Sequence, residues 1–106
     1  MRRTAVYKHP LFLAHYTGRG HLESSRRLEA LYGELAGVAS GARFLFPSFS
    51  PASCDTVLLN HSQELLQTVA ATASRVASML DADTRTSAAS FEAALYAAGA
   101  VIDGIR

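Results

Sequence analysis

Apolar residues recur at helical spacing in several parts of the chain. Leu28, Leu31, Tyr32 and Leu35 lie at positions i, i+3, i+4 and i+7, which line one face of a helix. Similar runs begin at Leu65 and Phe91. Serines stand before the runs, and serine hydroxyls cap helix N-termini. The pattern predicts helices at residues 25–37, 53–59, 62–79 and 88–104.

Two short segments, 4–8 and 42–47, contain the β-branched and aromatic residues typical of strands. A proline limits each of them, because proline restricts the residue before it and cannot donate to a strand ladder. Segments 9–23 and 80–86 lack a sustained period and are predicted loops. The element order predicts one mostly helical α/β domain with about two short parallel strands joined by right-handed crossovers.

Composition and charge exclude several classes of function. The chain is 49% hydrophobic and 18% charged, as folded proteins are, and its alanine-rich run at 93–100 lets elements approach closely. Ten basic and nine acidic residues, with basic pairs only at positions 2–3 and 26–27, make no stripe for nucleic acid. The N-terminal apolar stretch is too short for a signal peptide or a membrane span. Cys54 is the only cysteine, which excludes an intramolecular disulfide and favours a reducing cytoplasm.

The histidines are the candidate functional residues. Four are present, with no His-x-His, Asp-x-His or His-Glu-x-x-His spacing among them. His15 and His21 stand six residues apart across Gly18 and Gly20, which permit positive φ. They could be zinc ligands, or they could structure the loop and form the rim of a site. His61, at a helix entry, is more typical of a structural histidine that forms hydrogen bonds.

The stretch HYTGRGHLESSRRLEAL at 15–31 resembles the N-terminal signature T-G-x-G-H-P-E-x-P-x-R-L of the histone deacetylase superfamily, which includes acetoin-utilisation proteins and acetylpolyamine amidohydrolases. Leu22 and Ser25 replace the two prolines of that signature. Segments 58–69 and 80–104 resemble later family motifs in the same order. The resemblance implies the truncated N-terminal part of an arginase/deacetylase-like fold and, in the full-length family, zinc-dependent removal of acyl groups from lysine-like amines.

The resemblance also assigns residues. It implies a substrate-binding or rim role for His15, Gly18, Gly20, His21 and Asp83, and a place for Arg27 beside an internal channel. The alternatives are a solvated arginine in a first helical turn for Arg27 and an ordinary polar loop residue for Asp83. The family's zinc ligands, paired histidines and tyrosine have no counterpart among the 106 residues. We therefore predict no catalytic residue, no metal ligand and no cofactor in this chain.

Three functional hypotheses remain open. The chain can be a deacetylase-family fragment or remnant that does not hydrolyse acyl-amines alone. It can be a self-associating interaction or scaffold module, because apolar helix faces at Phe91, Leu95 and Ile102 need cover. It can also be part of an intact zinc-dependent deacetylase that further sequence completes. The expected partners are accordingly a second copy of the chain or the remainder of the fold, with no nucleic acid and no membrane.

Overall fold

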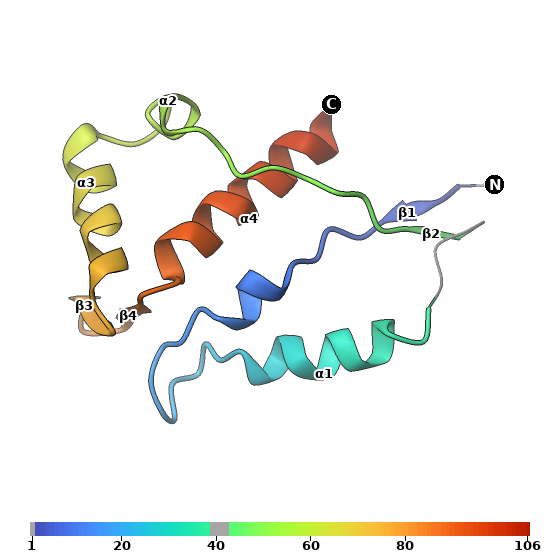
Figure 1. Ribbon diagram of the computed structural model, residues 1–106, viewed down its shortest axis with the longest axis horizontal. Helices are drawn as coiled ribbons and strands as arrows, with labels where there is room; N and C mark the ends of the chain where they lie inside the picture. Colours follow the sequence, from blue (N-terminus) through green and yellow to red (C-terminus); the bar gives the residue numbers. More distant parts are fainter. Residues whose placement is uncertain (1, 39–42) are drawn as a thin grey trace.

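A computed structural model describes residues 2–38 and 43–106, and the fold is a mixture of helices and short strands. The elements in chain order are β1 (Thr4–Ala5), the 3-10 helix η1 (Pro10–Leu13), α1 (Arg26–Leu35), β2 (Phe44–Leu45), α2 (Cys54–Val57), α3 (Gln63–Ala71), the 3-10 helix η2 (Thr72–Ser74), β3 (Ala77–Asp81), β4 (Thr84–Ser87) and α4 (Ser90–Ile105) (Figure 1). The predicted α/β class is confirmed, and a second, antiparallel strand pair is added to it.

Strands β1 and β2 pair in parallel, with Thr4 opposite Phe44, and α1 lies in the connection between them. The backbone N–H of Val6 adds one more bond, donated to the Leu45 carbonyl at 2.8 Å. Each strand has two residues, so the predicted strands at 4–8 and 42–47 extended beyond the observed ones. Residue 42 of the second prediction lies outside the described residues. The prolines that follow cannot donate to the ladder, which ends the pairing.

The region after α3 corrects the sequence prediction. The predicted helix 62–79 ends at Ala71, and the predicted loop 80–86 lies within a hairpin of β3 and β4. The backbone becomes extended at Arg75, with φ −122° and ψ 141°. The second strand of the pair contains two β-branched threonines, Thr84 and Thr86, which suit a strand. The apolar spacing through Val76 and Leu80 was compatible with both structures, and Val76, just before β3, is 88% exposed.

Helix α4 is the longest element and crosses the centre of the molecule (Figure 1). It begins at Ser90, two residues later than predicted. Residues 50–52 lie along it: Ala52 N–H donates to the Leu95 carbonyl at 2.9 Å, and Ser50 N–H donates to Asp103 Oδ2 at 3.2 Å. None of the helices described is both long enough and apolar enough to cross a membrane.

Gly99 is where α4 and this segment come closest. A Cβ built on Gly99 would overlap the Ser50 carbonyl and lie 2.9 Å from Ala52 N. The close approach is therefore possible only because position 99 has no side chain. The small residue at position 99 thus allows close packing against an irregular segment, whereas the alanine-rich run was expected to pack against a helix or a sheet.

An aromatic cluster, defined as Tyr7, His9, Phe12, Phe49 and Tyr96, joins the N-terminal segment to α4. Phe49 lies at its centre, with ring centroids 5.5 to 6.2 Å from those of Tyr7, His9, Phe12 and Tyr96. The His9 and Tyr96 rings are closer, at 4.5 Å. Aromatic pairs at such separations stabilise beyond the area that they bury.

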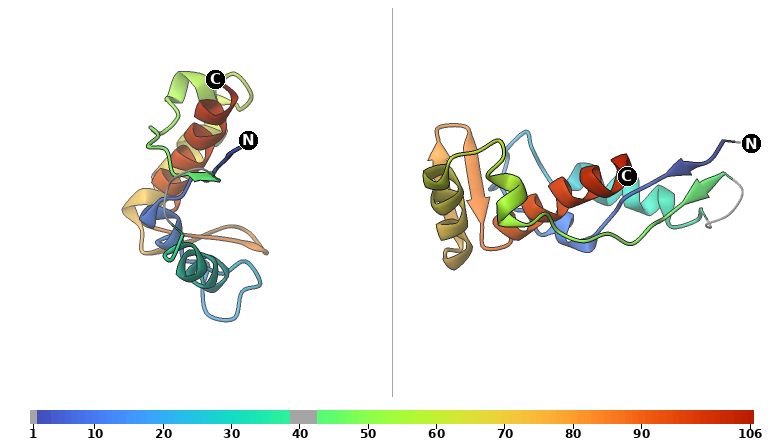
Figure 2. Two further views of the ribbon diagram at one scale, coloured as in Figure 1. Left: turned by 90° about the vertical axis from the view of Figure 1, so that its right-hand side faces the viewer. Right: turned by 90° about the horizontal axis from the view of Figure 1, so that it is seen from above.

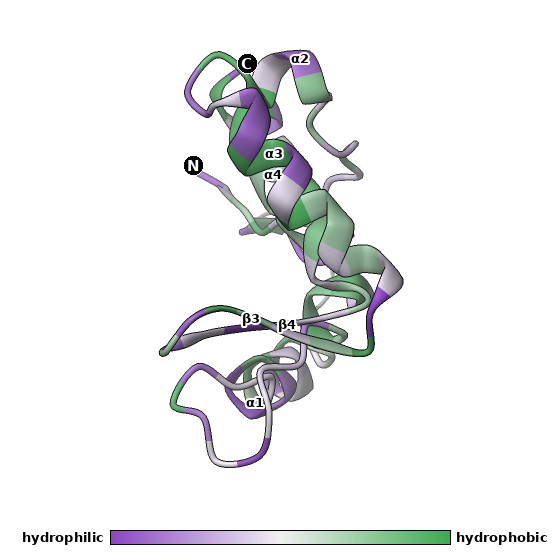
Figure 3. Ribbon diagram, turned by 90° about the vertical axis from the view of Figure 1, so that its left-hand side faces the viewer, coloured by the Kyte–Doolittle hydropathy of each residue, from purple (hydrophilic) through white to green (hydrophobic). Residues whose placement is uncertain are grey.

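Apart from this cluster, the molecule is thin and open. Its extents are 45 × 34 × 19 Å, and the narrow dimension is visible in Figure 2. The radius of gyration is 15.4 Å, against about 13 Å for a compact chain of this length. Only Ala52, Leu66 and Ala93 are buried hydrophobic residues in the described chain. Much of α3 and α4 is green, the colour of hydrophobic residues, in Figure 3. Because few hydrophobic residues of the described chain are buried, these helices carry apolar surface that little in the chain covers.

Candidate functional site

The loop before α1 is the centre of the candidate site, as the sequence indicated. Gly18 and Gly20 have φ values of 99° and 78°, so both use the left-handed region that favours glycine. Thr17, which is buried, donates its hydroxyl to the Glu23 carbonyl and closes the loop on itself. The loop is thus a defined structure between η1 and α1.

His15 fastens the loop to the start of α4. Its Nδ1 lies 2.6 Å from Ser90 Oγ, which also accepts the Ser87 backbone N–H at 2.8 Å. Ser87 Oγ accepts the Tyr16 N–H at 3.0 Å and donates to the Ala14 carbonyl at 3.2 Å. Both serines are buried, and their donors and acceptors have partners. The network joins the loop to the start of α4 and holds it in place.

His21 fastens the other side of the loop to the hairpin turn. Its Nε2 lies 2.7 Å from the Asp83 carbonyl oxygen, and its Nδ1 accepts the Glu23 backbone N–H at 3.0 Å. A carbonyl can only accept and a backbone N–H can only donate, so His21 is the neutral tautomer with its proton on Nε2. Both ring nitrogens are used, which leaves His21 no lone pair for a metal.

Arg27 and Asp83 have surface positions in the described chain. Arg27 Nη2 lies 2.7 Å from Glu23 Oε1, and their side chains are 69% and 57% exposed. Exposed pairs of this kind contribute little to stability. Asp83 meets the loop through its backbone, and its carboxylate makes no hydrogen bond to the residues described. The channel role of Arg27 and the substrate-binding role of Asp83 stay predictions.

The neighbouring Asp81 stabilises the hairpin turn. Its carboxylate accepts the Asp83 backbone N–H at 2.9 Å. This bond, together with the bonds from Thr84, holds the pKa of Asp81 below its ordinary value of 3.8, because each favours the charged form. A carboxyl group whose pKa is lower in the folded state stabilises that state above its unfolded pKa, and the contribution is lost as the pH falls through the folded pKa.

We therefore expect Asp81→Asn to lower the urea midpoint slightly at pH 7, and we expect its difference from the unmodified chain to shrink as the pH falls below 3.8. Asparagine keeps an acceptor oxygen but loses the charge that strengthens the turn. The matched control is Asp83→Asn, which removes a carboxylate without a hydrogen bond. A midpoint difference for Asp81→Asn that persists unchanged at pH 2.5 would show that its charge does not act on the turn.

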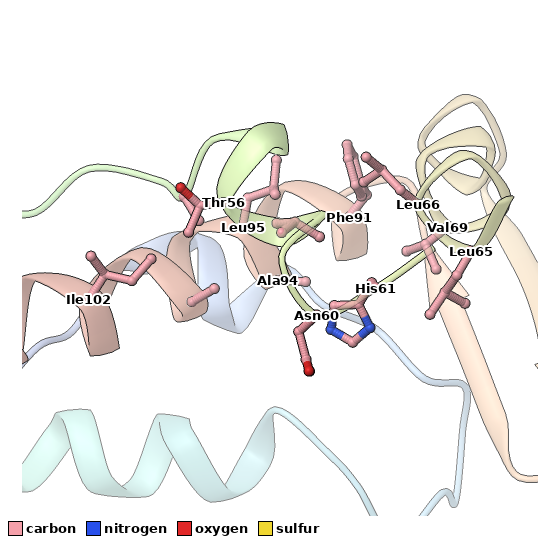
Figure 4. Close-up of a pocket in the computed structure, with 13 residues that line it drawn as sticks. Thr56, Asn60, His61, Leu65, Leu66, Val69, Phe91, Ala94, Leu95 and Ile102 are labelled. Carbon is pink, nitrogen blue, oxygen red and sulfur yellow. The ribbon is translucent and has the colours of Figure 1, made fainter. Parts of the chain in front are cut away.

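An apolar groove lies between α2, α3 and α4, with a volume of about 340 Å³. Leu65, Leu66 and Val69 of α3 face Phe91 and Leu95 of α4 (Figure 4). Asn60 and His61, on the segment between α2 and α3, supply polar groups at its edge. The His61 ring makes no hydrogen bond with the part of the chain that is described, so the expected structural hydrogen bond is absent from it.

A second hollow, of about 520 Å³, lies between the loop and the hairpin. Residues 16–18 form one wall and residues 77–79 the other, with Arg85 and Thr86 from β4. Arg85 pairs with Met79 across the hairpin, so the two side chains share a face. Arg85 was not singled out in the sequence, because a single arginine between threonines carries no pattern.

The donor set does not fit the zinc that the resembled family uses. Zinc sites take three or four ligands in tetrahedral geometry. In residues 2–38 and 43–106, no three His, Cys, Asp or Glu side chains gather closely enough to hold a metal ion. His15 and His21 lie in separate hydrogen-bond networks, and the structure brings neither of them to a third ligand. No reaction step through a metal is therefore derived for this chain.

Sequence reasoning found the loop and its histidines but missed their partners. Ser87 was considered only as a helix cap, whereas Ala89 precedes α4 and Ser87 binds the loop backbone. Ser90 was not considered. The only available signal was that the serines of the TRTSAAS segment precede a strong helix pattern, and this cannot show which distant residue they contact.

The similarity of this chain to known proteins comes from solved structures. A scan against protein-family models finds no match, and neither does a search of the curated proteins. Among solved structures, the crystal structure of the HDA15 HD domain matches 96% of this chain with a TM-score of 0.84 and 29% sequence identity. The chain spans about 30% of the length of that structure. Fold and sequence together show that the chain is related to the histone deacetylase superfamily and corresponds to part of a deacetylase domain.

Proposed function

We propose that this chain supplies one section of a deacetylase domain and does not hydrolyse acyl-amines by itself. In this proposal the loop at 14–23 and the hairpin turn form part of the rim of a substrate site. The remaining walls, the zinc and the catalytic groups belong to the rest of such a domain. The anchoring of His15 to Ser90 and of His21 to Asp83 supports a rim that is already shaped before the rest is added.

The observation that carries this proposal is the uncovered surface. The accessible area is 7648 Å², about 1,900 Å² more than a compact monomer of this size exposes. No large side chain among the described residues is fully buried, and Leu59, Val101 and Ile105 are more than 60% exposed. Such a surface is typical of a piece that packs against further structure.

The test uses the purified chain with added zinc and a fluorogenic acetyl-lysine substrate. We expect no zinc-dependent turnover above the buffer blank and no zinc retained after gel filtration. The control is the same assay after chelation, which should give the same baseline. Hydrolysis that zinc supports and a chelator abolishes would contradict the proposal.

Self-association is the second candidate, and the same area favours it. A standard interface buries about 800 Å² on each partner, so the excess surface is sufficient for one. Light scattering separates the two candidates. A single defined oligomer would favour a self-associating module, whereas a polydisperse mixture would favour a section that needs the rest of a deacetylase domain. A monodisperse monomer that unfolds cooperatively would contradict both.

A further inference from the structure

The hollow between the loop and the hairpin contains an arginine without a partner. Among the residues described, the one ion pair joins Glu23 to Arg27, so no carboxylate lies within ion-pair distance of the Arg85 guanidinium. The guanidinium also makes no hydrogen bond there. Arginine presents five N–H donors in a planar fork, and this fork matches the two oxygens of a carboxylate or phosphate group.

The Arg85 side chain is exposed and lies beside the loop at Gly18. A Cβ built on Gly18 would lie 3.1 Å from Arg85 Nη1 and 3.6 Å from Cδ. The absence of a side chain at position 18 therefore makes room for the guanidinium at the wall of the hollow. The loop itself is tied to Ser87, Ser90 and Asp83, so the two walls are held together.

The other walls combine apolar side chains with the hydroxyl residues Thr17, Ser78 and Thr86 and are open to water. Tyr16 is 58% exposed and Met79 is 60% exposed, and both line the hollow. Two carboxylates of the loop and the hairpin are engaged elsewhere: Glu23 pairs with Arg27, and Asp81 accepts the Asp83 N–H. The Asp83 carboxylate makes no hydrogen bond to the residues described, and it is not among the residues that line the hollow. A volume of about 520 Å³ lies within the range of small-molecule sites.

We propose that this hollow binds a small molecule that has an oxyanion at one end and an apolar or aromatic body at the other. Arg85 binds the oxyanion with its fork, while Tyr16 and Met79 contact the body. This site is independent of any deacetylase chemistry, because it needs only residues of this chain.

The test is a titration of the ¹⁵N-labelled chain followed by NMR, with benzoate, phenyl phosphate and benzamide as probes. Benzoate and phenyl phosphate each carry an oxyanion on an aromatic ring. Benzamide has the ring of benzoate without the charge. We expect saturable shifts at Gly18 and at Arg85 Nε–H for at least one of the two anions. The tighter anion identifies the preferred oxyanion, and benzamide should bind about tenfold more weakly or not at all.

Two variants locate the binding. Arg85→Gln should weaken the anion by about tenfold, and Arg85→Lys should be intermediate because it keeps the charge and loses the fork. Arg75→Gln is the matched control, since Arg75 does not line the hollow. Circular dichroism confirms that each variant is folded. The proposal is overturned if neither anion binds, if benzamide binds as well as the tighter of the two anions, or if Arg85→Gln binds that anion like the unmodified chain.

Discussion

Replacing Gly99 by alanine should destabilise the chain by about 3 kcal/mol, enough to unfold a marginally stable protein at room temperature. The new Cβ would overlap the Ser50 carbonyl and crowd Ala52 N, and both are backbone atoms that cannot rotate away. To relieve the overlap, residues 50–52 would have to leave α4 and lose the bonds to Leu95 and Asp103. Urea unfolding followed by circular dichroism measures the loss.

Gly33→Ala is the matched control for this variant. Gly33 is also inside a helix, but a Cβ built there meets nothing within 4 Å. Alanine has the higher helix propensity, so this control should gain up to about 1 kcal/mol. If Gly99→Ala also proves neutral or stabilising, residues 50–52 do not lie against α4 as described.

The second large effect is expected at Phe49. We expect Phe49→Ala to cost about 3 kcal/mol, because the ring contacts four others in the aromatic cluster and few other large side chains are covered in the described chain. The loss removes the ring at the centre of the cluster and leaves the His9–Tyr96 pair as its main link between the N-terminal segment and α4. Chemical denaturation measures the stability, and ring-current shifts of Tyr7 and Tyr96 report on the cluster itself.

Phe46→Ala is the comparison for Phe49. Phe46 is also half-buried, but its ring lies outside the cluster and faces the Lys8 ammonium, 5.0 Å from the ring centroid. We expect a smaller loss, about 1 kcal/mol, with the Tyr7 and Tyr96 resonances unchanged. Equal losses for the two variants would mean that the cluster contributes nothing beyond ordinary apolar burial.

Local patterns predicted much of the fold. The spacing of Leu28, Leu31, Tyr32 and Leu35 placed α1 to within two residues at each end, and α4 was placed nearly as well. The hairpin was missed because its few apolar residues fit a helical period, while the turn at 82–83 has no glycine or proline to announce it. Choosing between the two requires the cross-strand contacts, which periodicity does not contain.

The sequence predicted only the local part of the candidate site. Glycines 18 and 20 indicated a loop with positive φ, and both have it. The partners of His15 and His21 lie 75 and 62 residues further along the chain, beyond the reach of any local pattern. Arg85 and the groove between α2, α3 and α4 likewise depend on tertiary packing. The role of the loop in a complete domain stays a prediction.

The bonds of the loop also bear on the order of folding during synthesis. Tyr16 and His15 bond to Ser87 and Ser90, so the loop cannot be fixed until residues 87–90 have left the ribosome. The residues of helix α1 are local in sequence and emerge long before that. A nascent chain that pauses before residue 87 has emerged would therefore present an unanchored rim, and chaperones could meet it at this stage.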